Sequence, residues 1–158
     1  MNPGEPKTLP IERARQGLAW LWLGGGGLIF LLLVAQSLAG KYEGEVQEVW
    51  GWALPTIIPT LSLILAVLGV GALEPSDGLL KVRSAFYTIA FWLSATYLTL
   101  ILVTILVEPL TSDEPLALFK LSSFWLAPLQ GLVSSAIGVL FTRKPGPRAR
   151  LPRQPRSV

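Results

Sequence analysis

The chain has 158 residues, of which 51% are hydrophobic and only 15% are charged, and its formal net charge is +3. Soluble domains usually carry about 25% charged residues, so this composition excludes an ordinary soluble protein. The chain contains neither cysteine nor histidine, which excludes disulfides, thiol nucleophiles, histidine acid–base catalysis and the common zinc and haem sites. We therefore expect no enzymatic activity, no metal site and no cofactor.

Four apolar stretches follow a polar N-terminal segment, residues 1–16. Each stretch is long enough for a helix to cross the roughly 30 Å hydrocarbon core at a rise of about 1.5 Å per residue. Short polar turns separate the stretches, and a basic segment at residues 142–158 ends the chain. We expect an all-α integral membrane protein with an up-down four-helix bundle in residues 17–141, its transmembrane helices covering residues 17–39, 52–73, 85–107 and 121–141.

The first apolar stretch allows one alternative interpretation. Its basic start and the small residues Ser37-Leu38-Ala39 resemble a secretory signal peptide with a cleavage site. Signal peptides use an apolar core of about 7–15 residues, which is shorter than this stretch. We therefore favour a retained transmembrane helix, while cleavage would leave three spans.

The basic residues predict the orientation of the helices. Lys41 and Lys120 lie in the first and third turns, whereas the other eleven of the 13 Lys and Arg residues lie in the two terminal segments and the second turn. Basic residues concentrate on the cytoplasmic side of short loops, so both termini are predicted to be cytoplasmic. A Cys-free chain rich in Leu, Arg and Pro is compatible with a bacterial source, and the predicted location is the bacterial cytoplasmic (inner) membrane.

Small residues recur at helical spacing in the predicted spans. In lipid, helices associate by close backbone approach, which small residues permit. The stripes therefore mark helix packing, either inside the four-helix bundle or in an oligomer. The run of four glycines in the first span marks either a tight helix crossing or a hinge. The candidate packing residues are Gly24, Gly25, Gly26, Gly27, Ser62, Ala66, Gly69, Ala127, Gly131, Ser135 and Gly138.

Prolines interrupt the second and fourth spans and predict kinks at Pro55, Pro59 and Pro128. Each proline removes a backbone donor and leaves a carbonyl one turn earlier without its helical partner. Lipid cannot supply a replacement, so protein groups or water must do so. Thr56, Thr60 and Gln130 lie near these prolines in the sequence and could donate hydrogen bonds to the carbonyls. They are also the candidates for lining a polar vestibule.

A weak internal repeat relates the two halves of the chain. An alignment of Pro59 with Pro128 also aligns Gly69 with Gly138. Both halves are predicted to form hairpins with an acidic turn. Two repeated helical hairpins would produce this pattern. Chance similarity between apolar helices would produce it as well.

The C-terminal segment combines prolines with six basic residues, a composition typical of disorder. Basic residues next to a cytoplasmic membrane face attract anionic lipids. We expect Arg143, Lys144, Arg148 and Arg150 to contact lipid headgroups. No aromatic residues are interleaved with them, so nucleic-acid binding is not expected.

These features predict a small polytopic membrane protein that acts as a non-catalytic subunit or scaffold, packing with itself as a homo-oligomer or with other membrane proteins. The alternative is a self-assembling pore, channel or membrane-disrupting effector with a neutral Thr/Ser/Gln-lined path. No Asp, Glu, Lys or Arg lies in the middle of a span, which argues against a proton-driven transporter. An enzyme would need a carboxylate pair in a turn, such as Glu43 with Glu45 or Asp113 with Glu114.

Overall fold

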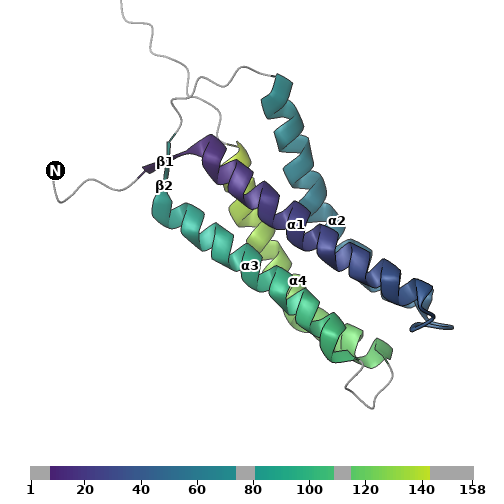
Figure 1. Cartoon of the computed structure of the whole chain (residues 1–158). Helices are drawn as coiled ribbons and strands as arrows, with labels where there is room; N and C mark the ends of the chain where they lie inside the picture. Colours follow the sequence, from purple (N-terminus) through teal and green to yellow (C-terminus); the bar gives the residue numbers. More distant parts are fainter. Residues whose placement is uncertain (1–7, 74–80, 109–114, 143–158) are drawn as a thin grey trace, which may run out of the picture.

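The computed structural model describes residues 8–73, 81–108 and 115–142. These residues form four long helices, α1 (Ile11–Leu38), α2 (Val46–Leu73), α3 (Ser84–Val107) and α4 (Pro115–Thr142) (Figure 1). All four are long and apolar enough to cross a membrane. The prediction of an all-helical protein with four helices long and apolar enough to span a membrane is therefore confirmed.

Three of the helices begin earlier than the apolar stretches that predicted them. α1 begins at Ile11 instead of residue 17, α2 at Val46 instead of 52, and α4 at Pro115 instead of 121. Hydropathy detects the part of a helix that matches the hydrocarbon core. The helical hydrogen bonds need no apolar side chain, so each helix continues through polar residues such as Glu12 and Glu48 outside that core.

Around the bundle the helices follow the order α1, α2, α4, α3, so that α1 and α4 each lie between α2 and α3. Consecutive helices run in opposite directions and form two hairpins, α1–α2 and α3–α4, that lie side by side (Figure 1). The last turns of α2 lean away from α1 in Figure 1. The cytoplasmic orientation of the termini and the repeated hairpin remain predictions.

The turn between α1 and α2 is a Schellman motif. Gly40 has a φ of +75°, its N–H donates to the Ser37 carbonyl at 3.2 Å, and the Lys41 N–H donates to the Gln36 carbonyl at 3.1 Å. This pattern satisfies carbonyls at the end of α1 and requires a left-handed residue, which glycine adopts without strain. Lys41 and Tyr42 thereby lie next to the last turn of α1, where both form hydrogen bonds with Gln36.

A short two-stranded ladder, not predicted from the sequence, lies at the opposite end of the bundle. Strand β1 (Thr8–Pro10) pairs antiparallel with β2 (Lys81–Arg83), with Leu9 opposite Val82. It joins the segment before α1 to the segment before α3, and Val82 is buried against the core. Three-residue strands are too short for an alternating pattern to be visible in the sequence.

The four consecutive glycines lie inside a continuous α1 and do not act alike. A Cβ added at Gly25 would lie 3.0 Å from Leu98 of α3, and one added at Gly26 would lie 3.5 Å from Leu61 of α2. Gly24 and Gly27 would meet no atom within 4 Å. Gly25 thus provides the close approach of α1 to α3, the crossing-point role predicted for this run.

Candidate functional site

The two prolines inside α2 leave the carbonyls of Gly51 and Pro55 without their usual helical donors, because Pro55 and Pro59 have no N–H. Gln130 of α4 supplies one replacement. Its Nε2 donates to the Pro55 carbonyl at 2.8 Å and to the Thr56 carbonyl at 3.3 Å. Gln130, predicted to compensate a proline kink, therefore does so across a helix–helix interface.

Tyr97 brings α3 into the same network. Its hydroxyl, on a side chain that is 0% exposed, donates to the Thr56 carbonyl at 2.9 Å. The Thr56 hydroxyl in turn donates to the Trp52 carbonyl of its own helix at 2.6 Å. The proline-containing part of α2 is thus connected to both α3 and α4 by hydrogen bonds.

Thr60, the third residue of the predicted vestibule, lies one turn farther along α2. Its hydroxyl is 3.5 Å from the Ser134 hydroxyl of α4, and its side chain is 0% exposed. Thr56, Thr60 and Gln130 therefore lie together along the α2–α4 interface. Their part in a conducting path remains a prediction, and Thr60 is covered by protein within a single chain.

A groove between α2 and α4 opens beside this network and is named here the α2–α4 groove. Its volume is about 230 Å³. One wall is the first part of α2 and the other is the middle of α4. The residues that line it are Gly51, Trp52, Pro55, Thr56, Ser123, Leu126, Ala127 and Gln130.

The small residues of α2 and α4 lie mainly on the outside of the bundle. A Cβ added at Gly69 or Gly131 would meet no atom within 4 Å. The helix-packing role of these residues is therefore not explained by contacts within the described bundle. The members with exposed positions are Ser62, Ala66, Gly69, Ala127, Gly131 and Ser135, and Gly138 is partly buried.

Pro128 lies inside α4 at an exposed position, where it removes the donor for the Phe124 carbonyl. The predicted lipid-headgroup residues Arg143, Lys144, Arg148 and Arg150 lie outside the described residues.

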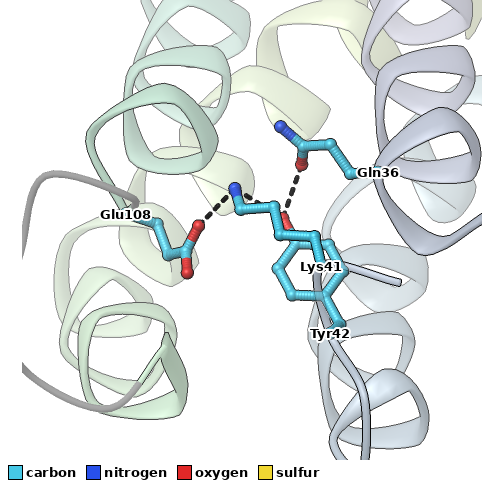
Figure 2. Close-up of polar contacts among 4 residues, drawn as sticks. All are labelled: Gln36, Lys41, Tyr42 and Glu108. Carbon is cyan, nitrogen blue, oxygen red and sulfur yellow. Dashed lines mark hydrogen bonds and ion pairs between the residues drawn. The ribbon is translucent and has the colours of Figure 1, made fainter. Parts of the chain in front are cut away.

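A second polar group, named here the turn cluster, was not predicted from the sequence and comprises Gln36, Lys41, Tyr42 and Glu108. Figure 2 shows the Lys41 ammonium lying between the Glu108 carboxylate and the Tyr42 hydroxyl, which are its ion-pair and hydrogen-bond partners. The Tyr42 hydroxyl donates to Gln36 Oε1 at 2.5 Å. The turn cluster joins the α1–α2 turn to the end of α3 and so ties the two hairpins together.

One sequence signal pointed toward this cluster. Lys41 is a basic residue in a turn that otherwise carries the acidic residues Glu43, Glu45 and Glu48. A single cation within an acidic turn suggests a specific partner. The sequence does not say which of several carboxylates that partner is, because Glu108 is remote along the chain.

Burial raises the pKa of the Tyr42 hydroxyl above its ordinary value of 10.0, although the charge and hydrogen bond of Lys41 act in the opposite direction. A raised pKa in the folded state means that folding favours the neutral phenol. This contribution is present below the unfolded pKa of about 10 and is lost as the pH rises through the folded pKa. We expect the free energy of unfolding to fall as the pH rises above about 10, and to fall less steeply in Tyr42→Phe.

The measurement is SDS-induced unfolding in mixed micelles at a series of pH values. Tyr42→Phe also loses the hydrogen bond to Gln36, so its stability should be lower by about 1 kcal/mol at neutral pH. Identical slopes above pH 10 in the two proteins would show that Tyr42 does not contribute to the pH dependence.

In the described segments, no group of three or more His, Cys, Asp or Glu side chains is placed to hold a metal ion. Comparisons of the sequence with protein-family models and with curated proteins, and of the structure with solved structures, find no match.

Proposed function

We propose that the protein is a non-catalytic membrane subunit or scaffold that packs with itself or with other membrane proteins through the outer face of α2 and α4. The observation that carries this proposal is the outward position of the small residues on these two helices. Gly131 is exposed, and an added Cβ there would meet nothing within 4 Å. In lipid, such a surface gains stability when another helix backbone approaches it closely.

The polar groups of the bundle support the same proposal. Gln130 and Tyr97 donate to backbone carbonyls, and Thr60 lies against Ser134. These contacts hold the helices of one chain together. They leave the exposed small residues as the surface on which another membrane protein can pack.

The proposal keeps the predicted setting of the protein. Both termini are cytoplasmic, the membrane is the bacterial inner membrane, and the basic C-terminal segment contacts anionic lipids. The excess of Lys and Arg in the terminal segments supports this orientation.

The test measures the mass of the particle in nanodiscs and identifies its protein components. We compare the natural chain with Gly131→Leu and with the control Gly24→Leu, which changes an exposed glycine on α1 that also has open space around it. Leucine at residue 131 holds an approaching helix away, so Gly131→Leu should weaken assembly by at least about tenfold. Gly24→Leu should assemble as the natural chain does.

A natural chain that is monomeric and co-purifies with no other membrane protein would contradict the proposal, as would equal effects of the two substitutions. The alternative, a self-assembling pore, is favoured by the polar side chains of Thr56 and Gln130 in the α2–α4 groove. Solute flux from liposomes that contain only this chain distinguishes the two. A subunit alone causes no solute flux, whereas a pore releases the solute.

A further inference from the structure

We propose that the α2–α4 groove binds the hydroxyl group of a neutral amphiphile, with the attached hydrocarbon chain lying toward the lipid. The proposal depends on the hydrogen-bonding groups that line the groove. It goes beyond the assembly proposed above and is tested by a different measurement, although Ala127 belongs both to the groove and to the exposed small residues.

The hydrogen-bond donors of the Thr56, Ser123 and Gln130 side chains are already used within the protein, whereas the indole N–H of Trp52 is buried and has no hydrogen-bond partner among the described residues. The Thr56 hydroxyl donates to the Trp52 carbonyl at 2.6 Å and the Ser123 hydroxyl donates to the Phe119 carbonyl at 3.2 Å. The Gln130 amide nitrogen donates to the Pro55 and Thr56 carbonyls, which accounts for both of its hydrogens. Leu126, Ala127 and Pro55 offer no donor at all.

Since the Trp52 indole nitrogen is buried, the groups that the lining presents to a ligand are acceptors. The amide oxygen of Gln130 is available as an acceptor, because the hydrogen bonds of this side chain to the Pro55 and Thr56 carbonyls both use the nitrogen. The Gly51 carbonyl loses its helical donor to the proline ring at residue 55. Unlike the Pro55 carbonyl, it receives no side-chain donor among the described residues. A polar group with unused acceptor capacity near lipid is stabilised by a ligand that donates hydrogen bonds.

The absence of charge in the lining indicates which class of hydrogen-bond-donating ligand the groove binds. None of the residues that line the groove, all of them within the described helices, is charged. A cationic donor would lack a counter-charge in a low-dielectric setting, and a phosphate or carboxylate would bring further acceptors and a negative charge. A neutral alcohol avoids both costs.

The position and size of the groove indicate an amphiphile. It begins near the end of the bundle that carries the 39–45 turn, where Trp52 packs on Phe119 with ring centroids 4.6 Å apart. Aromatic rings of this kind favour the membrane interface. A volume of about 230 Å³ is below the roughly 300–1,000 Å³ of sites that enclose a whole drug-sized ligand. The groove therefore suits a small polar head whose chain extends outside.

The test uses the full chain in mixed micelles and native mass spectrometry. The probe is dioleoylglycerol, and the matched control ligand is its methyl ether, which keeps the shape but has no hydroxyl hydrogen. We expect one dioleoylglycerol per chain and at least about tenfold weaker binding of the ether, since one hydrogen bond accounts for about that ratio. Equal binding of the two ligands, or no binding of either, would overturn the proposal and leave water as the occupant of the groove.

A variant pair locates the bound molecule. Ala127→Phe adds a large side chain to the groove at a residue that takes no part in the hydrogen bonds of Gln130, and it should abolish the preference for the hydroxyl ligand. Ala35→Phe, at an exposed position on α1 outside the groove, should retain it. Retention in both variants would overturn the assignment to this groove.

A competition experiment distinguishes recognition of a membrane lipid from recognition of a free alcohol. If 1-hexanol displaces dioleoylglycerol at an equal mole fraction in the micelle, the site recognises any alcohol. If only the diacyl compound binds, the site recognises a membrane lipid. Both results support a hydroxyl site, and neither depends on the oligomeric state that tests the proposed function.

Discussion

Replacing Glu108 by alanine is expected to lower the free energy of unfolding by about 3 kcal/mol. The Glu108 side chain is 6% exposed, and it pairs with Lys41, which is 23% exposed. Removing the carboxylate leaves a largely buried ammonium without its counter-charge, and such losses typically cost about 3–5 kcal/mol in a fully buried pair. The partial exposure of Lys41 places the expected value at the lower limit. SDS-induced unfolding in mixed micelles provides the measurement.

Two further variants test whether the effect comes from the ion pair. The double change Glu108→Leu with Lys41→Met removes both charges together and should recover most of the lost stability, because no buried charge remains. Glu43→Ala removes an exposed carboxylate of the same turn and should change stability by less than about 0.5 kcal/mol. If Glu108→Ala behaves like Glu43→Ala, the turn cluster does not stabilise the packing of the two hairpins.

Gln130→Leu is expected to destabilise the bundle by about 1 kcal/mol, with its effect depending on Pro59. The Gln130 amide replaces the backbone donor that Pro59 lacks, at 2.8 Å from the Pro55 carbonyl. Pro59→Ala restores an N–H that can donate to the same carbonyl. In that background Gln130→Leu should cost only about 0.3 kcal/mol, because the carbonyl keeps a partner.

Pro55→Ala is the matched control for this double-mutant cycle. It restores a donor to the Gly51 carbonyl, which Gln130 does not contact. The cost of Gln130→Leu should therefore be unchanged in the Pro55→Ala background. Equal coupling of Gln130 to both prolines, or to neither, would contradict the compensation of Pro59 by Gln130.

Part of the candidate site was predictable from the sequence. Pro55 and Pro59 were visible because proline has a defined chemical consequence in any helix. Of the nearby polar residues, Gln130 does bind a freed carbonyl. Thr56 and Thr60 do not, because their hydroxyls contact the Trp52 carbonyl and Ser134. Tyr97, which donates to the Thr56 carbonyl at 2.9 Å, was not predicted. Its role depends on which face of α3 meets α2, and a helix that is apolar on all sides does not reveal this.

The packing between helices could likewise not be predicted from the sequence. The stripes of small residues on α2 and α4 were predicted to be packing surfaces, but the same spacing suits a contact within one chain or between chains. The exposure of Gly131 shows that it does not pack against another described helix of the same chain, since no atom lies within 4 Å of an added Cβ. The ion pair of Lys41 with Glu108 similarly joins residues that are far apart in sequence.

The sequence alone determined the number and approximate position of the membrane-spanning helices and the places where prolines interrupt them. These properties follow from local chemistry, because a bilayer requires a long apolar helix and proline lacks a backbone donor. The tertiary structure decided the helix order α1, α2, α4, α3, the connection of Gln130 and Tyr97 to α2, and the outward position of the small residues. Those features depend on how apolar helices rotate and approach one another, and lipid solvates each apolar face almost equally well.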